Sequence, residues 1–204
     1  MRIVRSEKKP RAVVICGNGP TDRGLVACIA RKINGDMDNI KTMWIYDTEF
    51  VPGLLPSALG YRAFELAYFL CEHKQFRDTE YIVIIIDREH LKDAIDKLKH
   101  QKIRETLISI QRNNKHFEEA NIHRKTLLIG VCGEASKIEE NLARLAEHVL
   151  KLDPNTLPRD KKLRAILSKR YNVDYYDIIK KASIDVLIKH LQCIIVPLKR
   201  IDCR

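Results

Sequence analysis

The feature that most constrains the fold is the run YIVIII at residues 81–86, which is followed by Asp87 and Glu89. A run this short and this rich in β-branched residues predicts a strand buried on both faces, typical of a parallel sheet covered by helices. Ligands of such sheets bind at the carboxyl ends of the strands. The two acids therefore lie where a ligand site is expected, although Asp87 could equally cap a helix that begins near His90.

Three further segments have the pattern of strands, and amphipathic helices are predicted between them. The strands cover residues 11–16, 40–46 and 125–131, and the helices cover 21–33, 57–73, 91–98, 103–110 and 136–151. Ser136 and Glu139 fit a capping box at the start of the last helix, whereas residues 111–124 have the composition of a loop. Strands that alternate with helices predict an α/β fold, a Rossmann-like parallel sheet flanked by helices.

The chain divides into three predicted parts: a basic N-terminal tail (1–10), the α/β domain (11–152) and a basic helical C-terminal extension (153–204). Short helices are expected in the extension, over residues 161–171, 175–181 and 184–193, and residues 194–197 are apolar but ambiguous. The formal net charge of +10 divides into +4 on residues 1–11, −1 on 12–150 and +7 on 151–204. Basic ends on a nearly neutral body are typical of proteins that bind a polyanion, and a solvated lysine-rich surface fits the same numbers.

The composition of the chain bears on its cellular location and on the redox state of its cysteines. The longest apolar runs are too short to span a bilayer, and residues 1–10 lack the apolar core of a signal peptide, so we expect no membrane association and a cytoplasmic location. The six cysteines form no CxxC pair and no Cys/His cluster with zinc spacing. We expect them to be reduced core residues, although their number does not exclude a disulfide. Neither a protein partner nor a homo-oligomer is indicated.

Polar side chains follow three of the predicted strands at one edge of the sheet. Asn18 follows the first strand, Asp87 and Glu89 follow residues 81–86, and Glu134 and then Glu139 follow residues 125–131. Oxygen ligands of this kind suit Mg²⁺ or Mn²⁺, and these ions in turn suit phosphoryl chemistry. The two later glutamates have a second interpretation, as acids at a helix start that are stabilised by the helix dipole.

The turn after the first strand, GNGPTD at residues 17–22, carries two glycines. Asp22 stands where the third glycine of a GxGxxG dinucleotide motif is required, and no GK[ST] sequence is present for a P-loop. The turn could still bind an anion through its backbone N–H groups. A small-nucleotide-binding Rossmann-like protein is therefore one functional alternative.

Taken together, these elements resemble a Toprim domain, the metal-binding fold of topoisomerases, primases and OLD-family nucleases. The resemblance is closest to small stand-alone OLD-type proteins. It rests on NGPTD at residues 18–22 in place of a Glu-Gly-Pro-Thr-Asp-like turn, on Asp87-Arg88-Glu89 in place of D-x-D, and on an acidic third element over residues 134–140. It covers most of the chain, including the helical tail around residues 161–171.

This resemblance implies a Mg²⁺- or Mn²⁺-dependent phosphodiesterase, a nuclease, that acts on DNA or RNA. Asp87, Glu89, Glu134 and Glu139 would hold the metal, and Asp87, Glu89, Asn18 and Glu134 would form the catalytic set. The nucleic acid would be bound by basic residues of the tail, namely Lys161, Lys162, Arg164, Lys169 and Arg170. The same basic residues also fit a solvated helix face.

The chain departs from the Toprim pattern at the first acid, because the family has a glutamate where this chain has Asn18, or Cys16 if the turn is aligned without its two extra residues. An asparagine can coordinate a metal through its carbonyl oxygen but cannot accept a proton. An enzyme would therefore need Asp22, Glu134 or Glu139 to carry the acid–base role. The alternative is a catalytically inactive Toprim-like protein that binds nucleic acid or regulates another protein.

Overall fold

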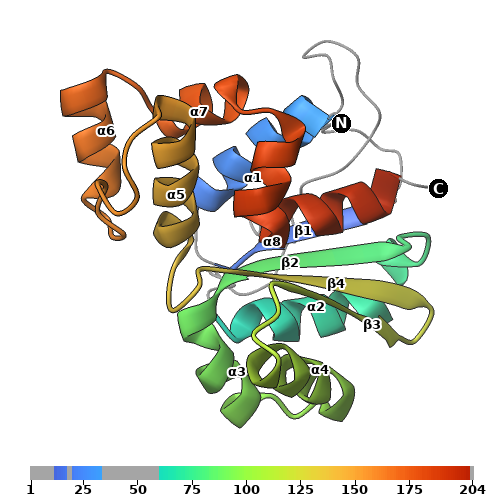
Figure 1. Cartoon of the computed structure of the whole chain (residues 1–204). Helices are drawn as coiled ribbons and strands as arrows, with labels where there is room; N and C mark the ends of the chain where they lie inside the picture. The colour runs from blue at the N-terminus through green and yellow to red at the C-terminus, as the bar shows by residue number, and fades with distance from the viewer. Residues whose placement is uncertain (1–11, 18–19, 34–59, 203–204) are drawn as a thin grey trace.

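The computed structural model describes residues 12–17, 20–33 and 60–202, which form a sheet flanked by helices (Figure 1). The strands are β1 (Ala12–Cys16), β2 (Tyr81–Asp87), β3 (Phe117–Ile122) and β4 (Lys125–Cys132). The helices are α1 (Pro20–Ile33), α2 (Arg62–Glu72), η2 (Lys74–Phe76), η3 (Arg88–His90), α3 (Leu91–Lys97), α4 (Gln101–Arg112), α5 (Ile138–Leu150), α6 (Leu163–Tyr171), α7 (Tyr175–Lys181) and α8 (Ile184–Asp202). The predicted basic tail, the strand expected at residues 40–46 and Asn18 lie outside the described residues.

The sheet has the strand order β1-β2-β4-β3, and β1, β2 and β4 run parallel. All seven residues of β2 are buried, as the apolar run predicts for a central strand. The pairing brings Asp87 of β2 opposite Cys132 of β4, so the carboxyl ends of these two strands are level. The predicted α/β fold, a largely parallel sheet flanked by helices, is confirmed.

The loop predicted over residues 111–124 is wrong for its second half, because β3 lies there antiparallel to β4. Its burial alternates, with Ala120 and Ile122 buried and Glu119 exposed. The strand is short and rich in charged residues, because it forms the edge of the sheet. The hairpin turn has His123 at φ 54°, a conformation for which glycine or asparagine is the usual signal. The sequence lacks that signal, and the strand was therefore not predicted.

Helices cover both faces of the sheet, with α2, α3 and α4 on one face and α1, α5, α7 and α8 on the other (Figure 1). Successive residues of each strand point to opposite faces, so Val83 belongs to one apolar cluster and Ile84 to the other. The C-terminal helices contribute Leu167, Ile179 and Leu187 to the cluster that contains Val83. The predicted C-terminal extension thus shares its hydrophobic core with the sheet.

Helix α8 is kinked at Leu191 (φ −124°, ψ 35°), and its second part continues through the segment that was ambiguous in sequence and contains Pro197. A proline has no N–H for the carbonyl four residues earlier, which here is the carbonyl of Cys193. That carbonyl lies against Gly130 of β4, where a Cβ would not fit. Helix α8 therefore packs on the sheet at backbone distance. Neither α8 nor any other helix of the described ranges is long and apolar enough to cross a membrane.

Candidate functional site

Asp87 ends β2 and is only 6% exposed. Its Oδ1 accepts a hydrogen bond of 2.9 Å from the backbone N–H of Ile138, the first residue of α5. Asp87 makes no capping hydrogen bond to η3, so the predicted cap of the helix near His90 is wrong, and the residue caps α5 across the sheet instead. The positive end of the α5 dipole stabilises a charged carboxylate there. A carboxylate has about four acceptor positions, so capping does not exclude metal binding.

Glu89 and His90 lie in η3, immediately after Asp87. The Oε2 of Glu89 accepts a hydrogen bond of 3.0 Å from the Ser136 hydroxyl, and its Oε1 lies 3.4 Å from Nζ of Lys137. One ligand atom from each of Asp87, Glu89 and His90 lies within 4.8 Å of the others. Two carboxylates and an imidazole form a donor set that could hold a divalent cation, with open positions for water.

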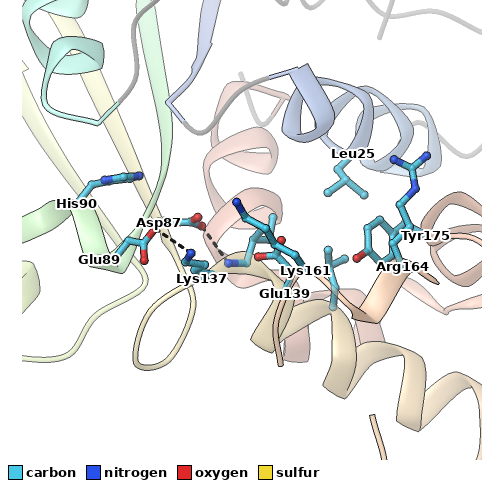
Figure 2. A pocket seen from close by; sticks show the side chains of 11 residues that line it. Leu25, Asp87, Glu89, His90, Lys137, Glu139, Lys161, Arg164 and Tyr175 are labelled. Atoms are coloured by element: carbon cyan, nitrogen blue, oxygen red, sulfur yellow. Dashed lines mark hydrogen bonds and ion pairs between the residues drawn. The ribbon is translucent and has the colours of Figure 1, made fainter. Parts of the chain in front are cut away.

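A cavity of about 340 Å³ opens beside this cluster. Its walls come from α1, the end of β2, η3, the start of α5, Lys161 just before α6, the first turn of α6 and the start of α7. The lining residues are Leu25, Asp87, Glu89, His90, Lys137, Ile138, Glu139, Leu142, Lys161, Arg164 and Tyr175. Figure 2 shows Asp87 and Glu89 on one side and Arg164 beside Tyr175 on the other. Asp87 and Glu89 therefore lie at one end of the cavity and Arg164 at the other, and each end also carries a group of opposite charge: Lys137 contacts Glu89, and Glu139 acts on Tyr175.

Tyr175 begins α7 and supplies the aromatic surface of the cavity. Burial raises its pKa to about 12, and the negative charge of Glu139 acts in the same direction. The phenol therefore stays protonated near neutral pH. It can donate a hydrogen bond or stack against a planar group, but it cannot act as a base.

The structure brings together only some of the predicted metal ligands. Glu139 lines the same cavity as Asp87 and Glu89. Glu134 lines a separate cavity of about 120 Å³, and its Oε2 forms an ion pair of 2.5 Å with Arg144. Asn18 and the side chain of Asp22 lie outside the described part of the chain, so the anion-binding turn stays a prediction.

The five basic residues predicted to bind nucleic acid fall into two groups. Lys161 and Arg164 line the cavity. Lys162, Lys169 and Arg170 are exposed but do not line it. A ligand inside the cavity can therefore reach the first pair, whereas the other three lie outside the cavity lining.

Glu140 fixes the loop between β4 and α5. Its Oε2 accepts hydrogen bonds of 2.8 Å from the backbone N–H groups of Glu134 and Ala135. Burial favours the protonated form, but hydrogen bonds from the backbone of residues 134–137 outweigh it and lower the pKa of Glu140. The predicted capping box of Ser136 and Glu139 is therefore wrong, because Glu140 is the capping acid and the Ser136 hydroxyl points to Glu89.

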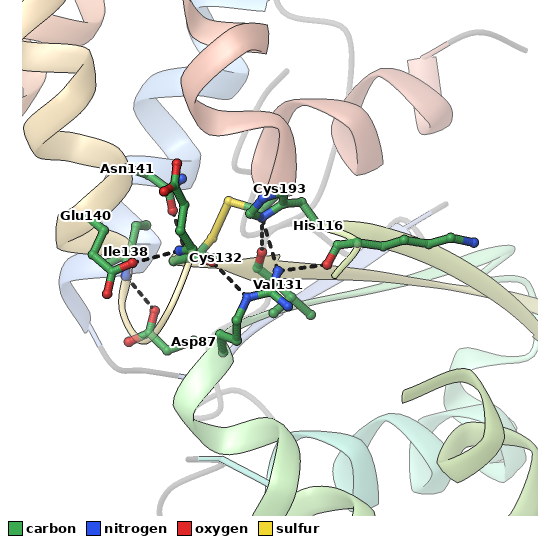
Figure 3. Close-up of a disulfide and its surroundings, with 12 residues drawn as sticks. Asp87, His116, Val131, Cys132, Ile138, Glu140, Asn141 and Cys193 are labelled. Atoms are coloured by element: carbon green, nitrogen blue, oxygen red, sulfur yellow. Dashed lines mark hydrogen bonds between the residues drawn. A yellow bond between two sulfur atoms is a disulfide. The ribbon is translucent and has the colours of Figure 1, made fainter. Parts of the chain in front are cut away.

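A disulfide joins Cys132, the last residue of β4, to Cys193 of α8 (Figure 3). Their Cα atoms are 5.4 Å apart, and both residues are buried. The expectation that the cysteines are reduced is wrong for this pair. Since Cys132 lies opposite Asp87 in the sheet, the crosslink anchors the strand end next to the acidic cluster.

Gly133 turns the chain from β4 into the loop, with φ at +84°. A Cβ at this position would lie 2.5 Å from the backbone nitrogen of Lys137, so only glycine fits. The Gly133 N–H donates to Oδ1 of Asn141 at 2.5 Å, and its carbonyl accepts a hydrogen bond of 3.0 Å from Arg88. These contacts hold the loop rigidly beside the cluster.

Lys137 and His90 line the cavity, but neither is among the site residues predicted from the sequence. The position of Lys137 in the sequence is itself a signal, because it lies just before a helix that follows a strand end, where ligands of parallel sheets bind. A lysine offers no carboxylate ligand, so the pattern of acids does not indicate it. No family model matches the chain, and comparisons with curated proteins and with solved structures found no match either. Membership of the Toprim family therefore stays a prediction.

Proposed function

We propose that this protein is a Mg²⁺- or Mn²⁺-dependent phosphodiesterase that cleaves nucleic acid at the carboxyl end of β2. One observation carries the proposal: the cluster of Asp87, Glu89 and His90 opens into a cavity whose other side carries Lys161 and Arg164. A cation held at one end and basic side chains at the other both attract an anionic ligand. A phosphodiester next to a second phosphate fits this distribution of charge.

Each group then has a role that follows from its position. Asp87, Glu89 and His90 hold the ion, which when bound would activate water and neutralise charge on the phosphate. Lys161 and Arg164 orient neighbouring phosphates. Among the described side chains, Glu139 is the further carboxylate in the cavity and is our candidate to accept a proton.

A second candidate function is nucleic-acid binding without cleavage. Asp87 and Glu89 already contact the start of α5, through Ile138 and through Ser136 and Lys137. Such contacts stabilise the fold whether or not an ion is bound. A protein that had lost catalysis could therefore keep both acids.

The test is cleavage of single-stranded and double-stranded DNA and RNA with Mg²⁺ or Mn²⁺, with EDTA as the blank. The key variant is Asp87→Asn, because asparagine can still accept the hydrogen bond from Ile138 but loses the charge. We expect cleavage to fall about 100-fold or more, whereas stability should fall by no more than about 1 kcal/mol, from the loss of a charged acceptor at the α5 N-terminus. Asp87→Ala should lose the cap as well, at about 1 kcal/mol.

Asp93→Asn is the matched control, because Asp93 pairs with Lys97 on α3 and does not line the cavity. It should cleave like the wild type. Equal cleavage by Asp87→Asn would overturn the enzyme proposal. No cleavage by the wild type, together with binding that weakens as salt rises, would favour the second candidate instead.

A further inference from the structure

Lys137 is held at the mouth of the acidic cluster by its backbone. Its own N–H donates to Oε1 of Glu140 at 3.4 Å, and its carbonyl accepts a hydrogen bond of 3.1 Å from the Glu140 N–H. The preceding carbonyl, of Ser136, accepts a hydrogen bond of 3.0 Å from the N–H of Glu89. These hydrogen bonds hold the main chain of Lys137 in place. Separation of its ammonium from Glu89 therefore requires rotation of the Lys137 side chain.

The ammonium of Lys137 is the cation that lies against the cluster in this structure. It is 3.4 Å from Oε1 of Glu89, and the two side chains are 34% and 37% exposed. A divalent ion that used Glu89 as a ligand would bring two positive charges to the same carboxylate. Like charges at such short range repel each other, so lysine and ion compete for Glu89.

We propose that Lys137 is the resident counter-ion of the metal site: its ammonium holds Glu89 until a divalent cation displaces it. The inference rests on the proposed function, because it takes the cluster of Asp87, Glu89 and His90 as the ion's ligands. It adds a residue that limits how tightly the ion binds.

The Lys137 side chain, once displaced from Glu89, can turn into the cavity. Lys137 lines the same cavity as Lys161 and Arg164, and Figure 2 shows its ammonium between the acidic side and Lys161. Turned from Glu89 into the cavity, the ammonium becomes a third positive charge for a bound phosphate. Entry of the ion thereby makes the cavity more attractive to an anion, and by linkage a bound anion strengthens ion binding.

The test is a Mn²⁺ titration without substrate, at low salt, in which electron paramagnetic resonance measures the unbound ion. Lys137→Gln removes the competing charge, and we expect its dissociation constant for Mn²⁺ to fall about fivefold below that of the wild type. Lys137→Arg keeps the charge and should bind like the wild type. Lys99→Gln is the matched control, because Lys99 is exposed, lies between α3 and α4, and does not line the cavity.

The outcomes separate this inference from the proposed function. Equal affinity of Lys137→Gln and the wild type, with Asp87→Asn weakened, overturns the counter-ion role and leaves the metal site. Tighter Mn²⁺ binding by Lys137→Gln, but not by Lys137→Arg or Lys99→Gln, supports the counter-ion role. This holds even if the wild type binds Mn²⁺ too weakly to measure. If neither the wild type nor Lys137→Gln binds Mn²⁺, both the counter-ion role and the metal site are wrong.

Discussion

Glu140 sets the conformation of the loop that carries Ser136 and Lys137. It accepts hydrogen bonds from the backbone N–H groups of Glu134 and Ala135, in the loop between β4 and α5. Because the folded state lowers the pKa of Glu140, the carboxylate is charged over more of the acid range when the protein is folded. The contribution of Glu140 to stability is present above its ordinary pKa of 4.5 and is lost as pH falls through the lowered value.

Glu140→Gln should therefore be less stable than the wild type at pH 7, by roughly 1 kcal/mol, because the amide is a weaker acceptor for these N–H groups. The difference should shrink as pH falls below about 4 and the wild-type acid becomes protonated. Urea unfolding at several pH values measures it. A difference that stays constant from pH 7 to pH 3 would contradict this role.

Single residues of the site were partly predictable from the sequence. The strand-end rule places Asp87 and Glu89 at a ligand edge without any knowledge of the partner strands. It cannot tell that Asp87 caps α5, because that contact depends on β2 pairing with β4. Nor can it separate Glu134 from Glu139, since the direction of each side chain depends on the residue at which α5 begins.

Helix α8 packs against β4 at Gly130, and this close contact is possible only because residue 130 has no side chain. Among the described glycines, Gly130 has the least room for a Cβ atom. The Cys193 carbonyl, which Pro197 leaves without its helical donor, occupies the space that a side chain at Gly130 would need. The disulfide between Cys132 and Cys193 joins the same two elements, at the same residue of α8 and two residues further along β4. Strand and helix therefore cannot separate locally to make room.

Gly130→Ala should destabilise the protein by about 1–3 kcal/mol, because the added methyl group would overlap the Cys193 carbonyl while the disulfide restrains α8 and β4 from moving apart. The expected result is a lower midpoint of thermal and urea unfolding. Thr126→Ala on the same strand removes atoms instead of adding them and should change the midpoint little. A Gly130→Ala variant as stable as the wild type would show that α8 does not pack on β4 at this distance.

Elements with strong periodicity were predictable, and those defined by tertiary contacts were not. The apolar runs of β1, β2 and β4 predict buried strands directly. Strand β3 depends on its pairing with β4, and the last turns of α8 depend on burial against the sheet, despite Pro197. Strand β3 and the end of α8 were not predicted because contacts with neighbouring elements stabilise them, and the local sequence does not show those contacts.

At the scale of the whole molecule, the cavity lies where the two halves of the chain meet. Its acidic side comes from the end of β2, and its basic side comes from residues 161–164, which follow α5. The sequence predicts a basic C-terminal part, but not that α6, α7 and α8 share one core with the sheet. This shared core places Lys161 and Arg164 across the cavity from Asp87 and Glu89.

The central claim, that Asp87, Glu89 and His90 hold a divalent ion, is tested most directly by a crystal soaked in Mn²⁺. We predict one anomalous difference peak among the three side chains, with carboxylate oxygens about 2.1 Å from the ion. The Lys137 ammonium should have left Glu89. A crystal that shows no ion there, with the contact between Lys137 and Glu89 intact, would contradict the account.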